Sequence, residues 1–320
     1  MTSVIPVEGS AQYFVVRSVM PVRHAAAVEL RHLRYFVCVA ETLHFTQAAA
    51  QLHVAQPALS RQIRQLEEEL GVALLERNRR RVELTPAGRT FLLEARNVLA
   101  QSAQAVRAAQ TAAHPHRGTL RVGYVWGLFH TTLPRWVHAF RSGAPEVSVH
   151  LFDLSATEQL IELKQGRIDL AFLGFEEGTS ADDFARQTLG SCAFVAAVPA
   201  GHRLARARRL KLSDLAREMF YSISEDTYPG AARRVREAFD AAGFAPRVVQ
   251  SAARGHTLLA LVAAQCGVAL VPETLAALPH PGVVLKPIQP APVGTLDVAW
   301  SSRRPHALRD AFVARLPHAR

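Results

Sequence analysis

Amide, hydroxyl and guanidinium groups between residues 45 and 70 have a spacing that suits the recognition of DNA bases. At about 100° per residue, one side of a helix over this stretch presents Gln56, Pro57, Ser60, Arg61 and Arg64. No aspartate or glutamate occurs among them. Glutamine pairs with adenine and arginine with guanine in the major groove, so this face predicts contacts with base edges.

The opposite side of the same helix is apolar and must be buried. Leu59, Ile63, Leu66 and Leu70 follow helical spacing. Ahead of them, Thr46 is expected to cap a helix whose run of alanines lets two helices cross closely. The pattern predicts a helix-turn-helix, with Thr46 among its DNA-facing residues. A helical hairpin with a solvated polar face is the alternative.

An arginine cluster follows Gly71, at which we expect the helix to end. Arg77, Arg79, Arg80 and Arg81 lie between two short apolar segments, the second with strand alternation. This arrangement is typical of the wing of a winged helix, where arginines meet phosphates or enter the minor groove. A solvated arginine cluster is the alternative. The neighbouring helix that presents Gln56 and Arg61, here called the reader helix, favours DNA contact, above all by Arg79 and Arg80.

A long helix is predicted to begin at Thr85 and Pro86, which supply a capping hydroxyl and a first-turn proline. No helix breaker follows until His114 and Pro115. The apolar residues between these points form a narrow stripe with few large side chains. Such a stripe needs a partner helix, so we expect a dimerisation helix that also links the DNA reader to the rest of the chain.

Beyond residue 118 the hydrophobic pattern changes to strands that alternate with helices. Apolar, β-rich runs such as 119–125 and 168–175 are separated by helical stretches, in two successive series. This order predicts a parallel sheet with helices on its faces, in two small α/β lobes with a ligand cleft between them. The predicted domains are a winged helix-turn-helix at 29–86, a linker helix and hinge at 87–117, and an effector-binding domain at 118–320, with lobe I at 118–189 and 290–320 and lobe II at 190–289.

The composition is that of a globular protein with a surplus of positive charge. Of 320 residues, 49% are hydrophobic and 20% are charged, and the formal net charge is +10. This balance favours a polyanionic partner such as nucleic acid, although the basic residues are spread along the chain. No apolar run approaches the ~18 residues of a membrane span, so we expect no membrane partner.

Three cysteines, Cys38, Cys192 and Cys266, make no disulfide framework, which fits a reducing cytosol. Buried inert thiols are expected, and a redox pair of Cys192 and Cys266 is the alternative. The histidines show no metal-ligand spacing, and the chain has no Walker loop, HExxH, Gly-x-Ser-x-Gly or strand-linked Gly-x-Gly-x-x-Gly motif. We therefore expect no enzyme activity, no metal and no cofactor.

Residues 1–28 match nothing in this organisation. Arginines interrupt the apolar stretch, so the segment lacks the core of a secretory signal. We interpret it as a poorly ordered extension or as an over-called start, with translation beginning at Met20 or Val28. Intact-mass analysis of the natively expressed protein that found Met1 at the N-terminus would exclude the second interpretation.

Residues 45–88, FTQAAAQLHVAQPALSRQIRQLEEELGVALLERNRRRVELTPAG, resemble the DNA-binding block of the LysR-type transcriptional regulators. The resemblance extends from Glu29 to the C-terminus. It implies a winged helix-turn-helix, a dimerising linker helix and a two-lobed α/β effector domain like periplasmic binding proteins. It also implies a cytoplasmic homodimer or homotetramer that binds double-stranded promoter DNA.

Carried over by motif, the family's DNA contacts fall on the residues of the reader helix and the wing: Gln56, Pro57, Ser60, Arg61, Arg79 and Arg80. One position departs from the common pattern, because Ala55 stands where many relatives have a serine that caps the recognition helix. Loss of such a cap costs about 0.5 to 2 kcal/mol, and we expect DNA binding to survive it.

Two further segments, RVGYVWGLFHTTLPR (121–135) and ELKQGRIDLAF (162–172), are similar to the branch that senses benzoate, muconate and related aromatic-degradation acids. The resemblance implies an aromatic or dicarboxylic acid as effector. Where those relatives hold the carboxylate with a serine and a threonine, this chain has Gly127 and Ala156, and nearby threonines could replace them. By position, the effector candidates are Trp126, Gly127, Leu128, Thr131, Ser155, Ala156, Thr157, Thr227, Tyr228 and Pro229.

These observations together predict a ligand-responsive transcription factor. An effector that closes the two lobes would tilt the linker helices, and so change DNA bending and contact with RNA polymerase. A transport-type solute receptor explains only the C-terminal lobes and predicts a secretory signal. A redox-responsive regulator that uses Cys192 and Cys266 is a third possibility, and thiol labelling unchanged by peroxide would exclude it.

Overall fold

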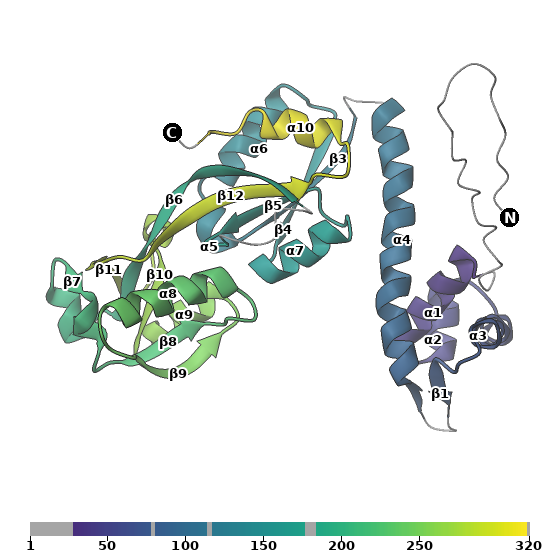
Figure 1. Ribbon diagram of the computed structural model, residues 1–320, viewed down its shortest axis with the longest axis horizontal. Coiled ribbons are helices and arrows are strands. Elements are labelled where there is room, and N and C mark those ends of the chain that lie inside the picture. The colour runs from purple at the N-terminus through teal and green to yellow at the C-terminus, as the bar shows by residue number, and fades with distance from the viewer. Residues whose placement is uncertain (1–27, 78–80, 114–116, 177–183, 319–320) are drawn as a thin grey trace, which may run out of the picture. The chain divides into compact units, whose positions relative to one another are not determined.

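The computed structural model describes residues 28–77, 81–113, 117–176 and 184–318. The predicted N-terminal extension and the tip of the predicted wing lie outside these ranges. The chain divides into two compact units, with the boundary after Leu99, inside a long helix. The first unit is mainly helical and contains a β-hairpin, and the second is a sheet covered by helices (Figure 1).

The first unit is a helix-turn-helix followed by a short β-hairpin. Its elements are α1 Leu30–Thr42, α2 Phe45–Gln51, α3 Gln56–Leu70, β1 Leu75–Arg77, β2 Val82–Leu84 and the start of α4 Pro86–Ala113. β1 and β2 pair antiparallel, with Leu75 opposite Leu84. The apolar stripe predicted for α3 is confirmed, because Leu59, Ile63 and Leu66 are fully buried in one core with side chains of α1 and α2.

The predicted end of α3 is confirmed, whereas the predicted cap of α2 is wrong. α3 ends at Gly71, which has a left-handed φ of 68°, as predicted. The expectation that Thr46 caps α2 is wrong, because the N-cap is His44 and Thr46 lies inside the helix. The His44 ring nitrogen Nδ1 accepts a hydrogen bond from the Gln47 N–H at 3.3 Å and so satisfies a first-turn donor as a hydroxyl would.

The second unit is built on ten strands that belong to one sheet system. The strands are β3 Gly118–Tyr124, β4 Val147–Asp153, β5 Leu170–Gly174, β6 Phe184–Pro199, β7 Leu210–Lys211, β8 Met219–Ile223, β9 Arg247–Ala252, β10 Val268–Pro272, β11 Val283–Gln289 and β12 Val293–Ser301. The helices are α5 Trp126–Phe129, α6 Leu133–Ser142, α7 Ala156–Lys164, α8 Pro229–Ala241, α9 Gly255–Ala263 and α10 Ala307–Val313, with 3-10 turns η1 Arg203–Arg206, η2 Leu212–Leu215 and η3 Glu273–Ala277.

Two α/β lobes share the long strand β6, which confirms the predicted fold class. The strand order is β4-β3-β5-β12-β6-β10-β8-β9. Within each lobe the strands that alternate with helices run parallel, as β3 does to β4 and β5, and β8 to β9 and β10. The first half of β6 pairs with β12 and its second half with β10 and β11. A continuous strand therefore joins the lobes.

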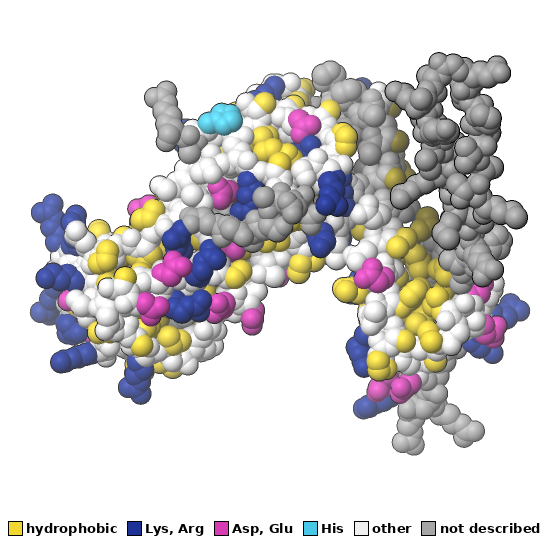
Figure 2. Space-filling view, viewed as in Figure 1, with side chains coloured by type: hydrophobic (Ala, Val, Ile, Leu, Met, Phe, Trp, Pro, Cys, Tyr) yellow, Lys and Arg dark blue, Asp and Glu magenta, His cyan; other side chains and the backbone are white. Residues whose placement is uncertain are grey.

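Positive side chains are found on both units. Figure 2 shows Lys and Arg gathered around β7 of the second unit as well as on the first unit. The exposed members near β7 are Arg206, Arg208, Arg209 and Lys211. The net charge of +10 therefore does not by itself locate the DNA-binding face.

Candidate DNA-reading face and effector cavity

The polar face of α3 is assembled as the sequence predicts. Gln56, Pro57, Ser60, Arg61 and Arg64 line one shallow surface depression. Gln56, Pro57, Arg61 and Arg64 are exposed, while the leucine stripe on the other side fixes the helix to its core. The face offers an amide, a hydroxyl and two guanidinium groups, which are the donors and acceptors that base edges in a major groove can pair with.

The wing is fixed to the end of α3 by a carboxylate. Glu67 Oε1 accepts hydrogen bonds from the backbone N–H groups of Leu74 at 2.9 Å and Leu75 at 3.0 Å. On the other side of the hairpin, the Thr85 hydroxyl donates to the Ala73 carbonyl at 2.8 Å and accepts from the Gly88 N–H at 2.8 Å. The hairpin therefore starts and ends at fixed points relative to the reader helix.

Not every predicted DNA contact can be placed. Arg79 and Arg80 lie outside the described residues. Arg81 is exposed and pairs with Glu83, at 3.5 Å from Nη1 to Oε1. Thr46, in the first turn of α2, has an exposed side chain. The recognition helix begins at Ala55 without a side-chain cap, as expected from the missing serine.

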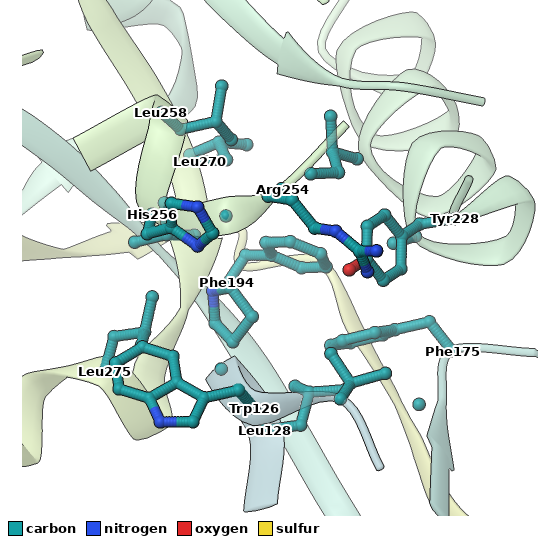
Figure 3. Close-up of a pocket in the computed structure, with 18 of the residues that line it drawn as sticks. Trp126, Leu128, Phe175, Phe194, Tyr228, Arg254, His256, Leu258, Leu270 and Leu275 are labelled. Carbon is teal, nitrogen blue, oxygen red and sulfur yellow. The ribbon is translucent and has the colours of Figure 1, made fainter. Parts of the chain in front are cut away.

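A cavity lies between the two lobes of the second unit, where strands end and helices begin. It is open to solvent at one side and is lined by residues of both lobes. Lobe I contributes the ends of β3, β4 and β5, and lobe II contributes the starts of α8 and α9 and the end of β10. Aromatic and aliphatic side chains dominate: Trp126, Leu128, Phe175, Phe194, Ile223, Tyr228, Leu258, Leu270 and Leu275 (Figure 3).

Four of the ten predicted effector residues line this cavity: Trp126, Gly127, Leu128 and Tyr228. The other six lie outside its lining. Ser155 and Ala156 are buried at the start of α7, Thr131 is exposed in the turn after α5, Pro229 is exposed at the start of α8, and Thr157 and Thr227 are partly buried where the lobes touch.

Two of the three candidate threonines, Thr157 and Thr227, take part in hydrogen bonds from one lobe to the other. The Thr157 hydroxyl donates to the Asp226 carbonyl at 2.8 Å, and the Thr157 N–H donates to the Thr227 carbonyl at 3.3 Å. Ser155 caps α7, because its hydroxyl accepts from the Glu158 N–H at 3.3 Å. Both hydroxyls are thus engaged in contacts within the protein.

An ion pair crosses between the lobes beside the cavity. Arg254, at the start of α9, places Nη2 at 3.1 Å and 2.9 Å from the two carboxylate oxygens of Glu158 on α7. Figure 3 shows the Arg254 side chain extending toward Tyr228. Burial raises the pKa of Glu158, but hydrogen bonds from Ser155 and the charge of Arg254 outweigh it and hold this pKa below its usual range. Glu158 is therefore a stable anion.

A second contact between the lobes uses a buried carboxyl group. Glu176 Oε1 accepts a hydrogen bond from the Gly230 N–H at 3.1 Å. A Cβ at Gly230 would lie 2.0 Å from the Phe175 carbonyl oxygen, so only glycine permits this approach. Burial raises the pKa of Glu176, and the Gly230 N–H and the charges of Arg233 and Arg186 oppose that rise.

Several cavity residues were not predicted from the sequence. Phe194 is in the second half of β6, Arg254 and His256 begin α9, and Asp153 ends β4. Asp153 is the last residue of β4 and Arg254 follows β9, so both lie at the carboxyl ends of parallel strands, where ligands bind, and this position was a usable signal. Phe194 carries no comparable signal, because it is one apolar residue in an apolar strand.

The cysteines provide no support for a redox pair. Cys192 is buried, and this burial raises the pKa of its thiol, which lowers the fraction of reactive thiolate. Among the described residues no group of three or more His, Cys, Asp or Glu side chains could hold a metal ion. Within the same ranges, no helix has the length and apolar character to cross a membrane.

Two family models match the chain and cover both units. Residues 30–89 match the bacterial regulatory helix-turn-helix protein model of the lysR family, and residues 113–319 match the LysR substrate binding domain. The chain belongs to the LysR family of transcriptional regulators. It is a DNA-binding regulator with an effector-binding domain and is not an enzyme.

Individual relatives agree with this assignment. The chain is 37% identical over 247 residues to the HTH-type transcriptional regulator AlsR of Bacillus subtilis, which covers 77% of this chain and 81% of AlsR. It is 36% identical over 249 residues to BenM of Acinetobacter baylyi, with 77% and 81% covered.

Solved structures show the same two-unit organisation. The crystal structure of CbnR, a LysR family transcriptional regulator, matches with a TM-score of 0.75 at 28% identity, over 90% of this chain and 97% of CbnR. Full-length CbnR bound to its target DNA matches with the same score over 90% of this chain and 99% of that chain.

Proposed function

We propose that this regulator reads promoter DNA with the polar face of α3 and responds to a small molecule held in the cavity between its lobes. The observation that carries the proposal is the convergence of Gln56, Pro57, Ser60, Arg61 and Arg64 on one exposed face, free of acidic side chains. Arg61 and Arg64 supply guanidinium forks for guanine, and Gln56 supplies an amide for adenine. Thr46, Arg79 and Arg80 complete the proposed contacts.

Control by ligand follows from the way the lobes are joined. A ligand in the cavity touches the start of α5 on lobe I and the starts of α8 and α9 on lobe II, so it binds one spacing of the lobes better than another. Such a difference in affinity is what shifts a conformational equilibrium. The linker helix α4 carries the change to the DNA-binding unit, and DNA bending and contact with RNA polymerase change in turn.

The assembly proposed for this function is a cytoplasmic homotetramer. The long α4 has exposed apolar side chains at Leu93, Val98 and Val106, which suit a second copy of the same helix. Paired DNA-binding units read two half-sites together, and four units multiply modest single-site affinities. The domains proposed from the sequence, at 29–86, 87–117 and 118–320, correspond to the reader, the dimerising linker and the ligand sensor.

We place the chain in the aromatic-catabolism branch of the family. Support comes from its similarity to BenM and from 35% identity to a probable cat1 operon transcriptional activator of Acinetobacter lwoffii. The sequence identity to AlsR, 37%, is as high as that to BenM, so identity alone does not separate the aromatic-catabolism branch from the rest of the family. The ring-lined cavity adds independent support for a cyclic ligand.

The test is binding of the full chain to DNA upstream of its own gene, compared with a shuffled sequence of equal length, at physiological salt. We expect a specific complex that Arg61→Ala weakens, and no comparable loss for Arg34→Ala, which removes an exposed arginine of α1 on the same unit. Equal affinity for both DNAs would contradict the proposed function. A specific complex equally weakened by Arg34→Ala would contradict the assignment of the α3 face.

A further inference from the structure

The walls of the cavity suit a ring but do not fix its orientation. Trp126, Phe175, Phe194 and Tyr228 present aromatic surface from both lobes (Figure 3). Aromatic side chains bind a second ring by stacked or edge-to-face contact over their apolar area. In a cavity of this kind, a small number of polar side chains fixes the orientation of the ligand and determines specificity.

Arg254 brings a hydrogen-bond donor without a partner to this cavity. It is the N-cap residue of α9 and belongs to the lining. Its Nη2 lies 3.1 Å and 2.9 Å from the two carboxylate oxygens of Glu158. Its Nη1 is buried and has no hydrogen-bond partner among the described residues. A buried donor on a charged group is unfavourable until an acceptor satisfies it, so Nη1 is a place for an acceptor from outside the chain.

Glu158 holds the guanidinium in position for such an acceptor. The Glu158 carboxylate is itself fixed at the start of α7, because Oε2 accepts a hydrogen bond from the Ser155 N–H at 2.7 Å. Since the guanidinium is planar and rigid, fixing Nη2 also fixes the direction of Nη1. A donor that is already oriented binds a ligand with little further loss of conformational freedom.

The fixed guanidinium belongs to the same wall as an aromatic ring. Figure 3 shows the Arg254 side chain extending toward Tyr228. Tyr228 is buried, which raises the pKa of its hydroxyl, and the positive charge of Arg254 opposes that rise. A ring compound that packs against Tyr228 therefore has Arg254 as a neighbouring donor.

The hydroxyl groups expected to hold the ligand are absent or engaged. Gly127 and Ala156 carry no hydroxyl, and Ala156 lies outside the lining. The Thr157 hydroxyl donates to the Asp226 carbonyl at 2.8 Å. Within the described part of the lining, Arg254 is the one lysine or arginine. A charged anchor for the ligand is thus available on lobe II.

We propose that Nη1 of Arg254 binds an acceptor oxygen of the ligand, a carboxylate or carbonyl oxygen carried by a ring that packs against Tyr228. Glu158 is a positioning residue, because it acts on the ligand only through Arg254. This inference rests on the proposed function and names the residue that determines specificity. Because Arg254 also binds Glu158 of lobe I, a ligand on Nη1 favours the spacing of the lobes in which that ion pair forms.

The test compares three probes of similar size on the full-length protein: benzoate and benzamide, which carry an acceptor oxygen, and toluene, which carries none. Calorimetry at physiological salt gives the affinities. Arg254→Met keeps an unbranched side chain and removes the donors. We expect the affinities of benzoate and benzamide relative to toluene to fall by about tenfold or more in Arg254→Met, because a hydrogen bond to a charged group is lost.

A purely structural role of Arg254 predicts a different result, because disturbed packing weakens all three probes alike. Equal losses for the three probes, or an unchanged preference for the two with an acceptor, would overturn the proposal, and so would failure of all three to bind the unmodified protein. The matched control is Arg208→Met, at an exposed position of lobe II outside the lining, which should leave the three affinities unchanged.

A second variant tests the positioning role of Glu158. Glu158→Gln retains an acceptor for Nη2 of Arg254 and for the Ser155 N–H and removes the negative charge. We expect benzoate to gain about threefold or more over benzamide, because the charge of Arg254 is then opposed less and favours the anion. An unchanged ratio of benzoate to benzamide would contradict an action of Glu158 through Arg254.

Failure of this inference is distinguishable from failure of the proposed function. If benzoate changes the footprint on DNA equally for the unmodified protein and for Arg254→Met, ligand control stands and the role of Arg254 is overturned. If Arg254→Met alters the preference among the probes as expected but no probe changes the footprint, the role of Arg254 is supported and the proposed control of DNA binding is contradicted.

Discussion

Glu158 on α7 and Arg254 on α9 form an ion pair that links the two lobes, with Nη2 at 3.1 Å and 2.9 Å from the two carboxylate oxygens. The two residues are far apart in the sequence, and both lie beside the cavity. Their pairing engages Nη2 of the lining arginine, leaves its buried Nη1 without a hydrogen-bond partner among the described residues, and connects the ends of two helices that a bound ligand would move. The same pair therefore influences both which ligand fits and how the lobes are held.

The Thr157 hydroxyl should contribute to the stability of the contact between the lobes. Thr157→Val keeps the shape of the side chain and removes the donor to the Asp226 carbonyl, so we expect a loss of about 1 kcal/mol in the free energy of unfolding of the effector domain. Chemical denaturation followed by tryptophan fluorescence measures this loss. The control is Thr257→Val at an exposed position of α9, and equal effects of both variants would show that the contact contributes nothing.

Glu176 should make stability depend on pH. Its pKa is raised in the folded protein by burial, so the folded state holds the proton more tightly than the unfolded chain does. Its contribution is therefore favourable below the ordinary value of 4.5 and is lost as pH rises through the raised folded value. Glu176→Gln retains an acceptor for the Gly230 N–H and cannot ionise.

We expect the stability of Glu176→Gln relative to the unmodified protein to increase as pH rises above 4.5, through the raised folded-state pKa of Glu176. Denaturation midpoints at several pH values measure the difference. The exposed Glu237 provides the matched control as Glu237→Gln. A difference for Glu176→Gln that is constant with pH would exclude the proposed ionisation.

Arg61 should determine base preference. We predict that Arg61→Ala costs about 1 to 3 kcal/mol at its cognate base pair and relaxes the preference there, because a bidentate contact to guanine is lost. Competition binding with single-base variants of the site measures both effects. Equal losses on specific and random DNA would show that Arg61 contacts only phosphate.

Arg80 should act in a different way. Arg80→Ala is predicted to weaken binding to all sequences and to reduce the slope of log affinity against log salt concentration by about one, because one phosphate contact releases about one counterion. Titrations at several salt concentrations give this slope. A change of sequence preference with an unchanged slope would instead assign Arg80 to base recognition.

Local periodicity was sufficient to predict which side of α3 is buried and which is exposed. The spacing of Leu59, Ile63 and Leu66 fixes which side of α3 is buried, and hence that Arg61 and Arg64 are exposed. The predicted cap of α2, Thr46, was wrong. His44 caps this helix with a ring nitrogen in place of a hydroxyl, and the sequence pattern does not distinguish a histidine cap from a threonine cap.

The cavity was harder to predict, because its residues come from distant segments. Lobe I residues Trp126 and Leu128 follow a recognisable strand and were found, whereas Arg254 of lobe II meets Glu158 only through the tertiary fold. Thr157 and Thr227 were expected to contact the ligand, and in the structure the Thr157 N–H donates to the Thr227 carbonyl between the lobes. The first half of β6, with Gln187, Thr188 and Gly190, lacks an apolar run and was not recognised as strand.

The most direct test of the central claim is a DNase footprint of the full chain on the DNA beside its own gene, at physiological salt, with and without candidate aromatic acids such as benzoate. We predict a protected stretch of several helical turns that shortens or shifts with a ring compound and is lost in Arg61→Ala. Protection no greater than on random DNA, with and without each compound, would contradict the account of a ligand-controlled reader of promoter DNA.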